Sequence, residues 1–181
     1  MYAIHPLPLH DFHTVTCLFV ENFPKIDDND FANAWSSIDL CSSMGLYYNA
    51  TLVGFGLVSC GAIAFLTIDK THRGGGNGTR LLQAIQATCD ELTLKPVNCN
   101  QVISWYKRHG FVISRTFPFI HDDIPTCEMS WSSPITTNSR STTRTSSTES
   151  ICISEISDEI TLPSVGELLE ALSAARRNLR A

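Results

Sequence analysis

The sequence lacks several patterns that would assign it to a broad class of protein. It has no dense basic run, and 13 Lys and Arg against 18 Asp and Glu give a formal charge of −5. This balance argues against general nucleic-acid binding and favours cationic partners. No apolar stretch is long enough to span a bilayer. Residues 1–17 lack a cationic start followed by an apolar run, so we expect no signal peptide.

The seven cysteines also lack a pattern, because none falls in a Cys-x-x-Cys pair and their number is odd. This scatter argues against both a disulfide framework and a zinc site. We therefore expect reduced cysteines, no metal and an intracellular protein, either cytoplasmic or nuclear. The sequons at Asn49 and Asn77 then count as chance matches.

At 181 residues the chain suffices for one globular domain with an appendage, and its composition changes near residue 132. We expect a folded domain over residues 1–132. Residues 133–162 predict a disordered, Ser/Thr-rich linker, since few apolar side chains offset the entropy of ordering. Residues 163–181 predict an amphipathic C-terminal helix, in which Ser164 and Glu167 form a possible capping box. That helix could dock on its own domain, on a partner or on a membrane, although its two glutamates weaken the membrane interpretation.

Hydrophobic periodicity predicts alternating strands and helices within the first domain. The expected strands cover residues 2–7, 62–68, 94–97, 111–117 and 127–132, with a hairpin over 46–58 that turns near Asn49. The expected helices run from Asp11 to Pro24 and over 31–40, 79–92 and 101–109. The resulting order is β-α-α-β-β-β-α-β-α-β-β, which is typical of the α/β (α+β) class.

A glycine-rich loop at residues 72–79 joins an expected strand to an expected helix. Its glycines let the backbone approach a bulky anion, and the unpaired N–H groups at the helix start would point at phosphate oxygens. Arg73 and Arg80 would add positive charge. The glycines are Gly74, Gly75, Gly76 and Gly78.

Two common nucleotide-binding motifs do not fit this loop. A P-loop requires a lysine after its last glycine, whereas Gly78 is followed by Thr79 and Arg80. A dinucleotide fingerprint requires a third glycine where this chain has Leu81. The loop therefore predicts a phosphate-bearing ligand of another kind.

Arg73, Gly76 and Gly78 fill an Arg-x-x-Gly-x-Gly pattern, which resembles the acetyl-CoA signature of the GNAT superfamily of N-acetyltransferases. A second segment, Trp105-Tyr-Lys-Arg-His-Gly-Phe111, resembles the Tyr-x-x-x-Gly-Phe segment of the same superfamily. Together with the element order, the resemblance covers residues 2–132. It implies a mixed, mostly antiparallel central sheet flanked by helices.

The resemblance also implies acetyl-CoA as co-substrate. The end of the strand at 62–68 would pair with the pantetheine arm and offer a backbone N–H to the thioester carbonyl. Tyr106 would stand beside the sulfur and protonate the departing thiolate as general acid, unless it only packs beside Trp105 and Phe111. The residues expected to bind acetyl-CoA are Leu66, Thr67, Ile68, Arg73, Gly74, Gly75, Gly76, Asn77, Gly78, Thr79 and Asn98.

The general base is missing from this pattern. Many superfamily members place a Glu early on the fourth strand, where this chain has Cys60. A water chain, His121 or a carboxylate of the acidic segment at residues 27–30 could replace it, and the sequence does not select among them.

By the same resemblance, two loops would wall the acceptor site, and both are acidic in this chain. Acidic walls favour a cationic acceptor such as a polyamine, a lysine side chain or an N-terminal amine. Two solvated surface loops would have the same composition. The residues concerned are Asp27, Asp28, Asp30, His121 and Asp122.

These patterns predict an acetyl-CoA-dependent N-acetyltransferase that acts on a small molecule or a protein. Two alternatives stay open. One is a catalytically silent acetyl-CoA-binding module whose tail recruits a protein partner, and the other is an unrelated protein that binds a phosphate ligand.

Overall fold

The structure, a computed structural model, describes residues 1–97, 99–117, 127–134 and 162–179. Its centre is a seven-stranded sheet in the order β1-β2-β3-β4-β5-β7-β6. Each neighbouring pair of strands is antiparallel except β4 and β5, which are parallel. The mixed, mostly antiparallel sheet and the order of strands and helices up to residue 132 confirm the predicted fold.

The bounds of the elements are as follows. The strands are β1 Tyr2–Pro6, β2 Met44–Tyr48, β3 Thr51–Ser59, β4 Ala62–Ile68, β5 Glu91–Leu94, β6 Val112–Thr116 and β7 Cys127–Ser132. The helices are α1 Phe12–Asn22, α2 Asp28–Ser36, α3 Asn77–Gln86, α4 Asn100–Arg108 and α5 Val165–Asn178, with short 3-10 helices at Leu9–Asp11 and Lys70–His72.

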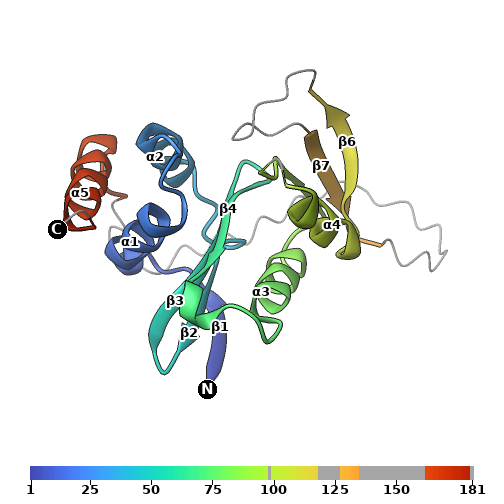
Figure 1. Ribbon diagram of the computed structural model, residues 1–181, viewed down its shortest axis with the longest axis horizontal. Coiled ribbons are helices and arrows are strands. Elements are labelled where there is room, and N and C mark those ends of the chain that lie inside the picture. The colour runs from blue at the N-terminus through green and yellow to red at the C-terminus, as the bar shows by residue number, and fades with distance from the viewer. Residues whose placement is uncertain (98, 118–126, 135–161, 180–181) are drawn as a thin grey trace, which may run out of the picture.

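Helices lie on both faces of the sheet (Figure 1). α1, α2 and α5 cover one face, and α3 and α4 cover the other. Each face has its own hydrophobic core, which we call the α1/α2/α5 core and the α3/α4 core. The largest fully buried side chains of the first include Phe19, Phe31, Trp35 and Phe55, and those of the second include Leu81, Leu82, Ile85 and Phe111.

The largest differences from the predicted bounds are at α3, β5 and α2. α3 ends at Gln86, not at residue 92, and β5 starts at Glu91 instead of at residue 94. Leu92 lies seven residues after Ile85 and two before Leu94, so its burial fits a helical and a strand period equally well. α2 begins at Asp28 instead of residue 31, since Asp27 caps it.

The C-terminal helix α5 docks on its own chain. Leu168 and Leu172 are 0% exposed and Ala175 is 6% exposed, all within the α1/α2/α5 core. Burying one leucine side chain stabilises a fold by about 1.5–3 kcal/mol. The predicted capping box of Ser164 and Glu167 is present.

Of the three possibilities for this helix, the structure therefore contains the first, docking on the rest of its own chain. Residues 135–161 of the predicted linker lie outside the described part of the chain, and the division into domains stays a prediction. None of the described helices is long and apolar enough to cross a membrane.

Candidate active site

The two central strands of the sheet separate along most of their length. Within the described residues, β4 and β5 pair only at Ala62 and Thr93. A β-bulge interrupts the pairing of β4 with β3 and leaves Ala64 without a register partner. Bulges bend a strand and increase its local twist. After its first residue, β4 therefore has one main-chain edge open in the middle of the sheet.

This open edge presents the main-chain groups of Leu66 and Ile68. The N–H of Asp69 donates to the carbonyl of Val53 on β3 (2.7 Å). Hydrogen-bonded pairs alternate along an antiparallel ladder, so Thr67 also bonds toward β3, whereas Leu66 and Ile68 direct their N–H and C=O groups away from it. A ligand that lies along this edge would meet main-chain donors and acceptors.

The glycine-rich loop after β4 has a backbone that favours glycine. Gly74, Gly75 and Gly76 have φ values of +85°, +56° and +78°. A Cβ added to any of the three would meet no atom within 4 Å. The left-handed backbone, and not crowding, therefore requires these glycines, and the space beside them is open. Asn77 is 5% exposed and donates from Nδ2 to the carbonyl of His72 (2.9 Å), which holds the loop in shape.

The loop ends at the N-terminus of α3, where backbone donors precede the first helical bond. That bond runs from the N–H of Arg80 to the carbonyl of Gly76 (2.9 Å), which is the N-cap residue. The N–H groups of Gly78 and Thr79 have no carbonyl within the helix to pair with. The helix dipole adds about 0.3–1 kcal/mol of attraction for an anion at such an end. Together with the open space beside the glycines, these donors fit a phosphate group.

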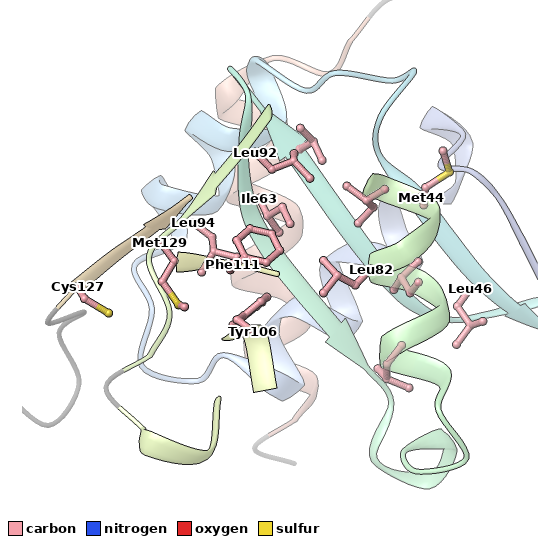
Figure 2. Close-up of a cluster of buried hydrophobic side chains, with 14 of the residues drawn as sticks. Met44, Leu46, Ile63, Leu82, Leu92, Leu94, Tyr106, Phe111, Cys127 and Met129 are labelled. Atoms are coloured by element: carbon pink, nitrogen blue, oxygen red, sulfur yellow. The ribbon is translucent and has the colours of Figure 1, made fainter. Parts of the chain in front are cut away.

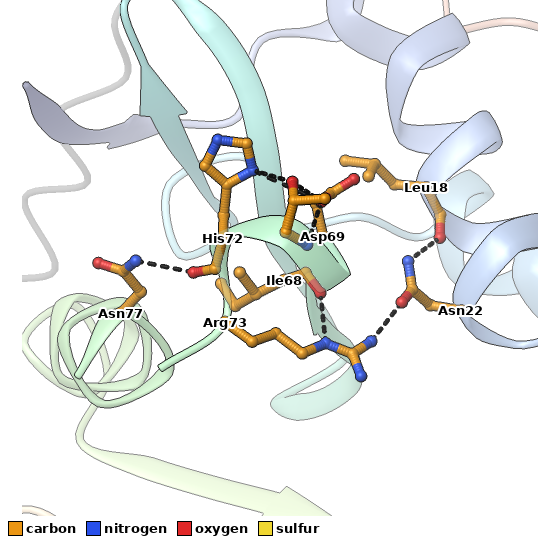
Figure 3. Close-up of polar contacts among 8 residues, drawn as sticks. Leu18, Asn22, Ile68, Asp69, His72, Arg73 and Asn77 are labelled. Atoms are coloured by element: carbon orange, nitrogen blue, oxygen red, sulfur yellow. Dashed lines mark hydrogen bonds and ion pairs between the residues drawn. The ribbon is translucent and has the colours of Figure 1, made fainter. Parts of the chain in front are cut away.

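The side chain of Arg73 joins β4 to α1 (Figure 3). Its Nε donates to the carbonyl of Ile68 (2.9 Å), and its Nη2 donates to the side-chain oxygen of Asn22. Asn22 in turn donates from Nδ2 to the carbonyl of Leu18 in α1 (2.8 Å). In this arrangement the guanidinium braces the start of the loop, and its expected role as a phosphate ligand stays a prediction.

Tyr106, the expected general acid, lies on α4 with its ring in the α3/α4 core. It is 8% exposed, and its ring meets those of Trp105 and Phe111 edge to face, with centroids 4.8 and 5.4 Å away. Figure 2 shows the ring beside Phe111, in the same cluster as Ile63 of β4 and Leu94 of β5. Burial raises the pKa of Tyr106, so its phenol is neutral at pH 7.

Two residues that the sequence analysis did not assign, Trp105 and His109, join α4 to the N-terminus of α3. His109 Nε2 lies 3.2 Å from Thr79 Oγ1, and Gln86 Nε2 donates to the His109 carbonyl (3.0 Å). The Trp105 ring lies 3.6 Å from the position of a Cβ added to Gly78. Burial is the main cause of a lowered pKa at His109, so the imidazole is neutral at pH 7. The two motif segments are therefore in direct contact.

The acidic residues after α1 form the start of α2 instead of a loop. Asp27 is the N-cap residue, and the N–H of Asn29 donates to its Oδ1 (2.9 Å), which lowers the pKa of that carboxyl. Asp28 pairs with Arg176 of α5 (2.6 Å), while Asp30 is exposed in the first turn. The other expected site residues, Asn98, His121 and Asp122, lie outside the described residues.

Cys60, which the resemblance aligns with the Glu of other superfamily members, lies before β4, whose bounds are those predicted. It forms the turn before this strand together with Gly61, at φ values of +49° and +73°, and its side chain is exposed. Because the backbone at Gly61 is left-handed, which favours glycine, the extended strand starts only at Ala62. A Glu in place of Cys60 would lie in the turn and not on the open strand.

A different carboxylate, Glu128 on β7, comes close to the open edge. Its neighbours Cys127 and Met129 are buried in the α3/α4 core, and side chains alternate along a strand, so Glu128 faces the other side of the sheet. There it borders a cavity of about 230 Å³, which is also lined by Ala62, Ile63, Ala64, Thr93, Leu94 and Lys95. No local pattern marks this residue in the sequence, because its neighbours are set by strand register.

Comparison with known proteins agrees with this geometry. Residues 43–113 match the family described as acetyltransferase (GNAT) domain. The same segment contains β4, the glycine-rich loop and Tyr106. A comparison with curated protein sequences gives no match.

Several solved structures share the fold. Naa50 of Arabidopsis thaliana, in complex with the bisubstrate analogue CoA-Ac-MVNAL, is 23% identical over 72% of this chain and 98% of its own, with a TM-score of 0.59. Ard1 of Thermoplasma volcanium is 19% identical over 71% and 94% of the two chains, with a TM-score of 0.58. The ribosomal-protein-S18-alanine N-acetyltransferase of Escherichia coli is 17% identical over 73% and 94%, with a TM-score of 0.56. Residues 43–113 are therefore similar to a GNAT acetyltransferase domain, and the chain shares the fold of these three solved structures.

Proposed function

We propose that the protein transfers the acetyl group of acetyl-CoA to a primary amine of a cationic acceptor. One observation carries this proposal: the open edge of β4 runs directly into a glycine-rich helix N-terminus, and the Tyr106 helix is joined to that N-terminus. An extended arm and a phosphate group of one ligand can bind this edge and this terminus at the same time.

The main chain supplies most of the expected contacts to acetyl-CoA. The pantetheine arm would lie along Leu66, Thr67 and Ile68 of β4 and pair with the main chain of Leu66 and with the N–H of Ile68, as an added strand pairs with a sheet edge, while Thr67 bonds toward β3. The pyrophosphate would accept bonds from the N–H groups of the loop and of the first turn of α3, over residues 74–79. The free space beside the three left-handed glycines supports this placement.

Transfer forms the N–C bond, breaks the C–S bond and moves two protons. Tyr106 would donate its phenolic proton to the leaving thiolate and recover a proton, through solvent, from the nitrogen of the collapsing tetrahedral intermediate. At pH 7 an alkyl amine with pKa near 10.4 must first lose a proton, at a cost of about 4.6 kcal/mol. We propose Glu128 as the acceptor of this proton, directly or through a water in the cavity beside Ala64.

Among amine acceptors, a peptide or protein amine has support from the structural relatives. One of these is complexed with an analogue that joins CoA to the peptide MVNAL, and another acetylates an alanine of a ribosomal protein. Asp27 and Asp30 leave negative charge beside the proposed acceptor side, which supports a cationic amine. Polyamines and lysine side chains are also cationic, so this negative charge favours them as well.

The direct test measures release of free thiol from acetyl-CoA with a panel of peptides that have a free N-terminus, lysine peptides and polyamines. Turnover with one class identifies the acceptor. Acetyl-CoA binding without turnover of any amine would instead support the silent binding module, which the Cys60 departure first suggested. Absence of any thermal shift with acetyl-CoA would exclude both the active enzyme and the silent binding module.

The role of Glu128 has its own test. Glu128→Gln should lower kcat by about 100-fold, and Glu91→Gln, on the neighbouring strand, is its matched control.

A further inference from the structure

The segment between α1 and α2, residues 23–27, is held by a side chain from the far end of the chain. We call this segment the α1–α2 loop. Arg176 of α5 donates from Nη1 to the carbonyl of Pro24 (3.2 Å) and from Nη2 to the carbonyl of Ile26 (2.9 Å). It also donates from Nε to both carboxylate oxygens of Asp28 (2.8 and 3.1 Å) and from Nη2 to Oδ1 (2.6 Å).

This set of bonds uses the geometry of a guanidinium. Its five N–H donors lie in one plane, so a single side chain can bind a carboxylate with two nitrogens and still reach neighbouring carbonyls. The side chains of Arg176 and Asp28 are each 22% exposed, so water screens the pair less than it would at the open surface. The carbonyls of Pro24 and Ile26 lie between two helices, and Arg176 supplies their hydrogen-bond donors.

Part of the loop also faces α5 across a hollow that is open to the surface. A cavity of about 540 Å³ lies between them, lined by Asp27 and Asn29 on one side and by Leu169 and Ser173 on the other, with Arg176 beside it. The firm packing of α5 lies elsewhere, at Leu168, Leu172 and Ala175. Arg176 therefore supplies the polar contacts between α5 and the loop, in addition to the packing of Phe23 and Ile26 against the α1/α2/α5 core.

The loop also touches the reacting strand. Phe23, its first residue, packs on Phe65 of β4 with ring centroids 5.4 Å apart, and Phe19 packs on the same ring at 5.0 Å. Phe65 directly follows the bulge residue Ala64, on the face of the sheet where Glu128 borders its cavity. A displacement of the loop would therefore change the surface next to the point where an amine must approach.

We infer that Arg176 is a positioning residue for the acceptor site, and that α5 is a working part of that site. This inference rests on the proposed function. Arg176 fixes the α1–α2 loop as a wall beside β4, and it neutralises Asp28. The carboxylates that can still attract a cationic acceptor are then those of Asp27 and Asp30.

The test compares Arg176→Gln, Arg176→Lys and Arg177→Gln. Arg177 is the matched control, since it is exposed and borders a surface cavity with Glu167 and Glu170. With the best amine of the panel, Arg176→Gln should raise the acceptor KM by about 10-fold, with kcat changed by less than about 3-fold. The dissociation constant of acetyl-CoA should stay the same, and Arg176→Lys should recover part of the loss through its charge. Arg177→Gln should match the wild-type chain.

Hydrogen exchange supplies a readout that does not need turnover. Amides of residues 23–28 should exchange faster in Arg176→Gln than in Arg177→Gln, while those of α3 do not change. Faster exchange with an unchanged acceptor KM overturns the inference, and so does unchanged exchange. If the wild-type chain acetylates no amine, the proposed function fails first and the acceptor role of the loop falls with it. An active chain with an unchanged KM removes only the role of Arg176.

Discussion

The two faces of the sheet differ in how far apart along the chain their contacting residues lie. On the α3/α4 face, the bond between Thr79 and His109 joins the two motif segments across 30 residues. On the α1/α2/α5 face, the pair of Asp28 and Arg176 spans 148 residues. The first bond joins two nearby segments, and the second joins segments near the two ends of the chain. Short motifs therefore describe the side proposed to bind acetyl-CoA much better than the proposed acceptor side.

The strongest test of the α3/α4 face is Tyr106→Phe. The phenylalanine ring keeps the contacts with Trp105 and Phe111 but has no proton to give. We expect kcat to fall by about 100-fold or more, with the dissociation constant of acetyl-CoA nearly unchanged. Steady-state kinetics and calorimetry measure the two quantities. An unchanged kcat would leave Tyr106 only a packing role.

The α1/α2/α5 face is tested by Leu172→Ala in α5. Leu172 is 0% exposed, so the truncation should leave a cavity and lower the free energy of unfolding by about 2–5 kcal/mol. Val165→Ala in the same helix is the control, since Val165 is 44% exposed and should cost less than about 1 kcal/mol. Chemical denaturation of both variants measures the difference. Equal stabilities would mean that α5 does not dock in solution.

A smaller effect should separate the glycine-rich loop from an ordinary turn. Gly75→Ala and Gly61→Ala each place a Cβ on a left-handed backbone, at φ +56° and +73°, with open space around it. Each should cost about 1–2 kcal/mol of stability. Only Gly75→Ala should also weaken acetyl-CoA binding, as titration calorimetry can measure. A matching loss of affinity in Gly61→Ala would contradict the loop as the phosphate site.

The smallest effect concerns the turn that precedes this loop. The N–H and hydroxyl of Thr71 donate to Asp69 (2.7 and 2.5 Å), and the hydroxyl bond is the largest cause of a lowered pKa at Asp69. A carboxyl with a lowered folded-state pKa stabilises the fold above its unfolded pKa, and this stability is lost as pH falls through the folded value. Asp69→Asn should cost about 1 kcal/mol at pH 7, with the deficit shrinking below about pH 4. A deficit that does not change with pH would exclude this role of the charge.

The sequence predicted those features that depend on neighbouring residues. β4 and β7 have their expected bounds, and the glycine-rich loop was predicted because a left-handed backbone strongly favours glycine. Tyr106 was found by its place in a short motif. Its raised pKa was not predictable, since burial depends on how α4 packs against the sheet.

The features that the sequence missed depend on distant contacts. Glu128 reaches its cavity through the register of β7 beside β5, and Arg176 meets Asp28 only once α5 has docked. The acidic segment at residues 27–30 was predicted to be a loop, but Asp27 caps a helix whose first turn is itself acidic. Local patterns predict backbone shape, whereas the partner of a charged side chain is set by tertiary packing.

The 148 residues between Asp28 and Arg176 also affect how the protein is made. Ribosomes add about 5–20 residues per second, so roughly 7 to 30 seconds pass between synthesis of the α1–α2 loop and synthesis of the arginine that holds it. During this interval β4, the glycine-rich loop and Tyr106 can assemble, while the loop lacks its guanidinium. By the proposed function, a nascent chain would then be able to hold acetyl-CoA before its proposed acceptor wall is complete.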